Sequence, residues 1–141
     1  MSSTVKSGKL EPVELVVMGA KSSADGAISS ISQSAGIEVE GFTHVRVDFF
    51  VSSNLTVDLD FIVRSPDNGS ASGAWWAQLA NDTGAAIAMS GLGAGADVYR
   101  SLVFYVGGAE RFDVRVTSFT DASGSGDTFQ YQIRRHNPVG V

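Results

Sequence analysis

The chain has 141 residues, 43% of them hydrophobic and 18% charged, with a net charge of −5 and a pI near 4.8. A chain of this length fits one domain that buries roughly two thirds of the surface exposed when it is unfolded, so folding requires no disulfide. Apart from Arg134 and Arg135, the ten basic residues are scattered, which argues against a nucleic-acid partner because phosphate binding needs clustered Lys and Arg.

The sequence contains neither cysteine nor a long apolar run. The absence of cysteine excludes disulfides, thiol catalysis and cysteine-ligated metals, and predicts synthesis in a reducing cytoplasm. The first residues are polar and lead into no apolar signal-peptide core, so no secretion signal is expected. No stretch approaches the roughly 20 apolar residues of a membrane-spanning helix, so no membrane association is expected.

The first third of the chain begins with a polar segment. Residues 1–12 end at a proline and are predicted to form a flexible arm before the folded domain. Alternation around Leu15 and Val17 predicts a first strand. Residues 19–36 are rich in Ser, Ala and Gly, which favours a loop or ragged edge strand, with a single helical turn as the alternative. Alternation resumes at residues 37–40.

Two central stretches, Thr43 to Val51 and Leu55 to Val63, alternate almost strictly between apolar and polar residues. Successive side chains of a strand point to opposite sides, so each stretch predicts a strand with one buried face. Phe50 is the one apolar residue on the polar face of the first stretch. Residues 65–69 contain a proline, two turn-forming residues and a glycine, and predict a turn.

The last third of the chain predicts further strands. Trp75 and Trp76 begin a short strand, and residues 84–95 form a loop or weak strand. Val98 to Val106 is the most continuous apolar run and predicts a strand buried on both sides. Phe112 to Phe119 and Thr128 to Ile133 alternate again.

Seven or eight strands without a long amphipathic helix predict an all-β protein in which two antiparallel sheets pack face to face. This β-sandwich, of jelly-roll or immunoglobulin-like type, is expected to span residues 13–136, with residues 137–141 as a C-terminal tail. The alternation leaves the order of the strands open.

The polar residues predict no enzyme, metal site or cofactor. His44 is expected on an outer face and His136 near the tail, both as ordinary surface residues. Asp58, Asp60 and Asp67 suit calcium as an alternative, but pairing of the strand carboxylates with Arg46 or Arg115 explains them better. Residues 91–96 match the dinucleotide pattern Gly-x-Gly-x-x-Gly/Ala, yet a strand follows instead of a helix, so a hairpin loop is predicted.

Aromatic side chains are the best candidates for recognition, because they stack on sugars and anchor protein interfaces. Trp75, Trp76, Tyr99 and Tyr105 are therefore predicted partner-contact or glycan-contact residues. Alternation places only one of the two tryptophans inward, which favours one buried residue and one partly covered residue over an exposed pair.

Several segments share a pattern with a known group of proteins, namely Phe42 to Asp48, Leu55 to Phe61, Pro66 to Gly69, Trp75–Trp76 and Arg111 to Val116. They resemble small β-sandwich virion proteins of tailed bacteriophages, in which a Val- and Thr-rich strand leads to an Asp/Gly turn and a tryptophan. A later strand of the type Arg-Phe-Val-Arg-Val completes that pattern. The resemblance covers roughly residues 37–134, while the loop at residues 84–97 and the doubled tryptophan depart from it.

The resemblance implies a virion structural protein, namely a capsid decoration or cement protein that binds and stabilises the major capsid protein lattice. It also implies a homo-oligomer, with a trimer as the first expectation because decoration proteins sit at symmetry axes. The alternative is a carbohydrate-binding or host-recognition module, such as a virion knob or fibre component, that uses the exposed aromatics. A glycosidase using Asp58 and Asp60 is rejected, because neighbouring carboxylates on one strand face lack the required geometry.

Overall fold

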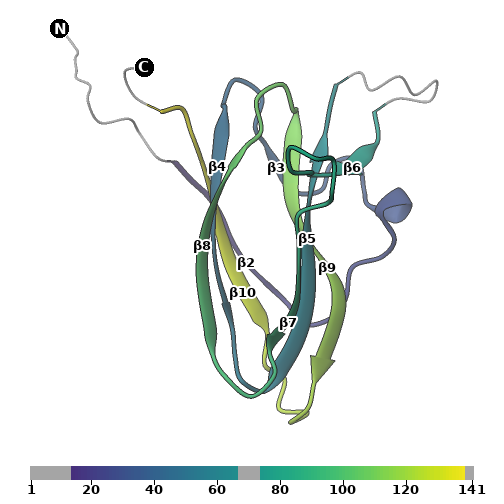
Figure 1. Ribbon diagram of the computed structural model, residues 1–141, viewed down its shortest axis with the longest axis vertical. Coiled ribbons are helices and arrows are strands. Elements are labelled where there is room, and N and C mark those ends of the chain that lie inside the picture. The colour runs from purple at the N-terminus through teal and green to yellow at the C-terminus, as the bar shows by residue number, and fades with distance from the viewer. Residues whose placement is uncertain (1–13, 67–73, 139–141) are drawn as a thin grey trace, which may run out of the picture.

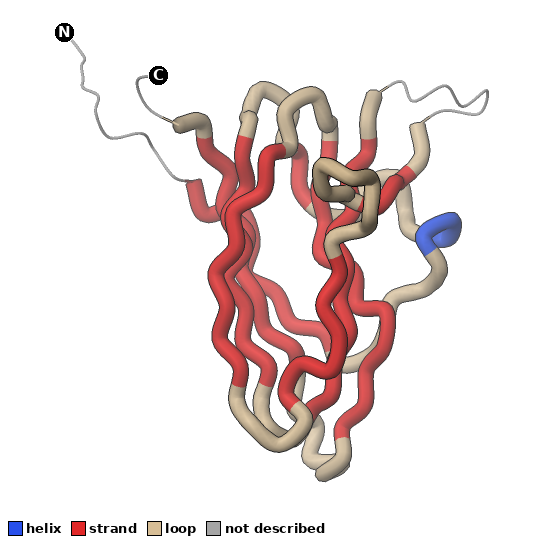
Figure 2. Tube along the Cα trace, in the orientation of Figure 1, coloured by secondary structure: helices blue, strands red, loops and turns tan. Residues whose placement is uncertain are grey.

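The computed structural model describes residues 14–66 and 74–138, which form two antiparallel sheets packed face to face (Figure 1). The described strands are β2 (Glu14–Lys21), β3 (Ile37–Glu38), β4 (His44–Val51), β5 (Leu55–Arg64), β6 (Trp76–Gln78), β7 (Ala88–Gly93), β8 (Val98–Tyr105), β9 (Arg111–Asp121) and β10 (Phe129–His136). Strand dominates the described chain, and one short helical turn, η1 (Ile28–Ser30), interrupts it (Figure 2). The predicted β-sandwich is confirmed, with more strands than the seven or eight expected.

The strand order identifies the sandwich as a jelly roll. One sheet has the order β2-β10-β4-β8, and the other has β3-β9-β5-β6, with β7 also paired to β5. The first strands therefore pair with the last ones in a nested series, β2 with β10, β3 with β9, β4 with β8, and β5 with β6 and β7. This nesting selects the jelly roll over the immunoglobulin-like alternative.

The core fills the space between the two sheets. The alternating residues of β4, β5 and β9 supply most of it, as their pattern predicts. Phe61 of β5 and Phe104 of β8 join the sheets, with ring centroids 4.5 Å apart, and Phe112 of β9 lies beside both. Burial of these apolar faces is the main stabilising term of the fold.

Two predictions about the β7–β8 region are wrong. Strand β8 is not buried on both sides, because Tyr99, Val103 and Tyr105 are exposed on its outer face. Residues 91–96 do not form a hairpin loop, because β7 pairs with β5 in one sheet and β8 pairs with β4 in the other. The turn after β7 therefore carries the chain from sheet to sheet. Gly93 has a φ of 90°, and a Cβ there would collide with the Leu55 carbonyl oxygen.

The connection between β2 and β3, residues 22–36, lies against the outside of the five-stranded sheet (Figure 1). It is a loop with the single turn η1, in agreement with the sequence pattern. The Trp76 indole Nε1 donates a hydrogen bond to the Ser32 carbonyl oxygen at 2.9 Å, and the Asp25 amide donates to the Val116 carbonyl oxygen at 2.8 Å. These contacts attach the connection to β6 and β9.

Beneath this connection, Asp60 of β5 pairs with Arg115 of β9. Asp60 is only 2% exposed, and it accepts hydrogen bonds from Arg115 Nε at 2.9 Å and Nη2 at 2.5 Å. Gln78 Nε2 donates to the same carboxylate at 2.8 Å. Burial raises the pKa of Asp60, but the hydrogen bonds and the Arg115 charge lower it by more, so the net pKa lies below its ordinary value. The predicted pairing with Arg115 is confirmed.

Replacing Arg115→Met should destabilise the protein by about 3–5 kcal/mol at pH 7, because it leaves a buried carboxylate without its partner. Because folding lowers the pKa of Asp60, the ion pair stabilises the folded protein at pH values above the pKa of Asp60 in the unfolded chain. This stabilisation is lost as the pH falls through the pKa of Asp60 in the folded protein. The difference in free energy of unfolding between the unmodified protein and the variant should therefore become smaller below about pH 4. Urea unfolding across this pH range measures both effects.

The control is Arg46→Met, which removes the exposed partner of Asp48. It should cost less than about 1 kcal/mol, because exposed ion pairs contribute little. Equal losses in the two variants would contradict the structural role assigned to the Asp60–Arg115 pair.

Candidate recognition face

The four-stranded sheet presents an ordered outer surface, hereafter the outer face. Its side chains form rows across the strands, because β10, β4 and β8 pair in continuous register. From one end to the other, the rows on β10, β4 and β8 are Gln130, Phe50 and Tyr99; Gln132, Asp48 and Ser101; Arg134, Arg46 and Val103; and His136, His44 and Tyr105. Strand β2 adds Ala20, Met18 and Leu15 beside the first three rows.

Apolar side chains are concentrated on this face. Of the six exposed large hydrophobic residues in the described ranges, five lie on the two edge strands of this sheet, namely Leu15, Met18, Tyr99, Val103 and Tyr105. The middle strands supply mainly polar and charged groups. The outer face therefore has two apolar borders around a polar centre.

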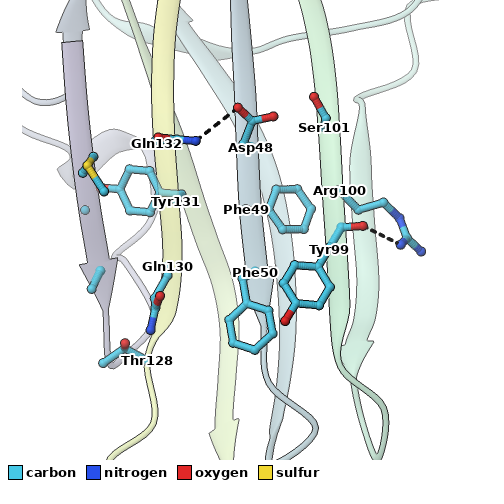
Figure 3. Close-up of a pocket in the computed structure, with 13 residues that line it drawn as sticks. Asp48, Phe49, Phe50, Tyr99, Arg100, Ser101, Thr128, Gln130, Tyr131 and Gln132 are labelled. Carbon is cyan, nitrogen blue, oxygen red and sulfur yellow. Dashed lines mark hydrogen bonds between the residues drawn. The ribbon is translucent and has the colours of Figure 1, made fainter. Parts of the chain in front are cut away.

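A hollow of about 810 Å³ lies at the Tyr99 end of the outer face (Figure 3). All four strands line it. The rings of Phe50 and Tyr99 lie side by side, with centroids 4.6 Å apart and planes tilted by 34°. Met18 of β2 forms the opposite border and is 72% exposed, while Tyr99 is 70% exposed.

Asp48 supplies the carboxylate of the hollow. It accepts hydrogen bonds from Arg46 Nε at 3.2 Å and from Gln132 Nε2 at 3.4 Å. Burial raises the pKa of Asp48, but hydrogen bonds from Ser101 and Arg46 and nearby positive charges lower it by more, so the net pKa lies below its ordinary value. Asp48 is therefore ionised at neutral pH and its position is fixed by its neighbours.

The other end of the outer face holds an aromatic cluster. The His44 ring stacks on the His136 ring, with centroids 5.6 Å apart, and meets the Tyr105 ring edge-on at the same distance. The Thr43 hydroxyl lies 2.7 Å from His44 Nδ1. His136 thus belongs to β10 and is half-buried, in contrast to its predicted position near the tail.

The four predicted contact residues do not form one site. Tyr99 and Tyr105 share the outer face but lie at opposite ends of β8. Trp76 begins β6 in the other sheet and is 4% exposed, while Trp75 precedes it and is 46% exposed. The expectation of one buried and one partly covered tryptophan is confirmed.

The sequence pattern did not predict the other residues that line the hollow. Phe50 carried a signal, because it is the apolar exception on the polar face of its strand. The sequence pattern contains no such signal for Met18, Gln130 or Gln132. Their place in the hollow follows only from the pairing of β2, β10 and β4, which are distant in the sequence.

The carboxylates considered for calcium have other partners. Asp60 binds Arg115, and Asp58 Oδ1 accepts a hydrogen bond from the Gly91 amide at 2.8 Å. Asp67 lies outside the described residues, as do residues 1–12 of the predicted arm and residues 139–141 of the predicted tail. Within residues 14–66 and 74–138, no three His, Asp or Glu side chains come together in a metal-binding group.

No protein-family model, curated protein or solved structure matches this chain. In the part of the chain that the structure describes, no helix has the length and apolar character needed to cross a membrane. The resemblance to bacteriophage virion proteins thus stays a prediction.

Replacing Trp76→Ala should destabilise the protein by about 3–5 kcal/mol, because it opens a cavity beneath the connection and removes the hydrogen bond to Ser32. Trp75→Ala is the matched control and should cost substantially less, since nearly half of that side chain is exposed. Urea unfolding followed by circular dichroism measures both. A larger loss in the Trp75 variant would contradict the assignment of the buried tryptophan.

Proposed function

We propose that the protein is a non-enzymatic virion structural protein, a capsid decoration or cement protein that binds the major capsid protein lattice through the outer face. The observation that carries the proposal is the gathering of exposed apolar side chains on one sheet face. Exposed hydrophobic residues scattered singly need no explanation, but five of the six exposed large ones in the described ranges lie on one face of one sheet, and such gathering is typical of protein contact surfaces.

The edge strand β8 supports a protein partner. Sheet edges are commonly protected by charges, proline or bulges, because their free amide and carbonyl groups pair readily with another chain. Strand β8 has eight residues, one charged residue, Arg100, and an unbroken register with β4. The opposite edge, β2, has a register shift against β10. Strand β8 is therefore the better-suited edge for docking a partner segment.

The polar centre of the outer face also suits binding better than catalysis. Arg46 contacts both Asp48 and Ser101, at 3.2 Å and 3.1 Å, so these groups satisfy one another. A reaction centre requires a nucleophile or base with a perturbed environment and room for substrate. This mutual pairing favours a surface that fixes the orientation of a partner.

The choice of a capsid lattice, and of the virion as the place of action, comes from the resemblance of the strands described above. The jelly roll occurs in viral capsid proteins and in lectins, and a fold by itself does not assign a function. Binding at a symmetry axis of the lattice would favour the trimer expected from the resemblance. Light scattering of the purified protein measures that copy number.

The binding proposal predicts that the gene for this chain lies in the genome of a tailed bacteriophage, and it is tested with purified protein and expanded, DNA-filled capsids of that bacteriophage prepared without the protein. The protein should bind with saturable stoichiometry and raise the temperature at which the capsids break. Val103→Lys should weaken binding by about tenfold or more, because it places a charge in the apolar border.

Thr56→Lys is the matched control, since Thr56 is also an exposed β-branched strand residue but belongs to the five-stranded sheet. It should bind like the unmodified protein. Failure of the unmodified protein to bind or stabilise the capsids would overturn the proposal, and equal weakening by both lysines would overturn the assignment of the outer face.

A further inference from the structure

We propose that the hollow at the Phe50–Tyr99 end of the outer face is a binding site for a neutral glycan. Three properties of the hollow carry this inference, namely its paired aromatic rings, its unpaired amide and its charge. Sugar binding here goes beyond the capsid contact, and the residues that line the hollow do not include Val103, which tests that contact.

The aromatic rings provide the apolar part of the site. Phe50 and Tyr99 are directly opposite each other on β4 and β8, and Figure 3 shows their rings together on the same side of the sheet. Tyr99 remains largely exposed although it packs on Phe50. An exposed flat ring of this kind offers its face to the C–H groups of a pyranose, while its hydroxyl stays available for hydrogen bonding.

The polar part of the site lies beside the rings. Gln130 is in the same row as Phe50 and Tyr99, and its side chain forms no hydrogen bond with the described residues. An amide supplies both donors and an acceptor, which is the combination that sugar hydroxyls require. Asp48 and Gln132 in the next row add a fixed acceptor and a second amide. A small number of polar groups around an apolar surface is typical of sites that bind small molecules.

The charge of the hollow favours a neutral ligand. Asp48 is ionised, and the whole chain carries a net charge of −5. Arg100 borders the hollow but donates to the Tyr99 carbonyl oxygen at 3.1 Å, and Figure 3 shows its guanidinium directed away from the rings. Arg46, the ion-pair partner of Asp48, does not line the hollow, so an anionic ligand in the hollow would meet the carboxylate first, which disfavours phosphates and acidic sugars.

The dimensions suit a short oligosaccharide. The hollow is lined by all four strands, β2, β10, β4 and β8. With neighbouring strands about 4.8 Å apart, it extends about 14 Å across the sheet. Met18 on the far strand then provides a second apolar contact for a sugar unit beyond the one on Tyr99.

The test uses the full chain on an array of neutral oligosaccharides of glucose, mannose, galactose and N-acetylglucosamine, with polygalacturonate and sialylated glycans as the acidic comparison. Calorimetric titration with the best neutral glycan then compares variants. Tyr99→Ala should weaken binding by about tenfold or more, and Gln130→Ala by about threefold or more. Tyr99→Phe keeps the ring and should retain most of the affinity, which separates loss of stacking from loss of folding.

Tyr105→Ala is the control, because Tyr105 is an equally exposed tyrosine on the same strand but lies at the other end of the face. It should bind within about twofold of the unmodified protein. Absence of binding to every neutral glycan at millimolar concentration, preference for acidic glycans, or equal weakening by Tyr105→Ala would each overturn the inference. These assays contain no capsids, so their failure is distinguishable from failure of the capsid proposal.

Discussion

The buried ion pair between Asp60 and Arg115 holds the five-stranded sheet to the connection between β2 and β3. It joins β5 to β9, and Arg115 also reaches the Gly26 carbonyl oxygen at 3.4 Å, so the pair contacts the connection that crosses above it. Trp76 fixes the same connection further along, through Ser32. A charge buried at this depth is tolerated only because each carboxylate oxygen has a partner. One face of the five-stranded sheet packs on the core, and residues 22–36 cover the part of its other face around Asp60 and Trp76.

The four-stranded sheet has no corresponding cover among the described residues, and this asymmetry is the reason for assigning recognition to its outer face. Its strands are built by the same apolar alternation, but the outward residues of β8 and β2 are apolar as well. The outer face consequently offers two kinds of contact. Its apolar borders and the edge of β8 suit another protein, whereas the hollow at Phe50 and Tyr99 suits a smaller ligand with both apolar and hydroxyl-bearing surfaces. The two contacts are separable by mutation, because Val103 lies outside the residues that line the hollow.

Local alternation was sufficient to predict the strands that form the core. β4 and β5 follow their predicted bounds within one residue, and the sheets pack face to face as expected. Alternation reports that a strand has two different faces, but it does not report what covers the outer one. The continuous apolar run of β8 likewise predicts burial on both sides although its outer side chains are exposed, and the alternation of β5 gives no sign that Asp60 is buried. The jelly-roll order was also beyond a local pattern, because it depends on pairs as distant in sequence as β2 and β10. Among the residues of the hollow, the sequence pattern predicted Tyr99 as a contact residue and marked Phe50 as an exception to the alternation. The other lining residues are recognisable only from the strand register.

The central claim is that recognition takes place on the outer face of the four-stranded sheet. Hydroxyl-radical footprinting tests it most directly, since methionine, tyrosine and tryptophan side chains are readily oxidised when solvent reaches them. Oxidation rates of Met18, Tyr99, Tyr105 and Trp75 would be compared between the free protein and the protein bound to capsids. The account predicts that Met18, Tyr99 and Tyr105 become protected together while Trp75 keeps its rate. Protection of Trp75 with unchanged rates at the other three would contradict it.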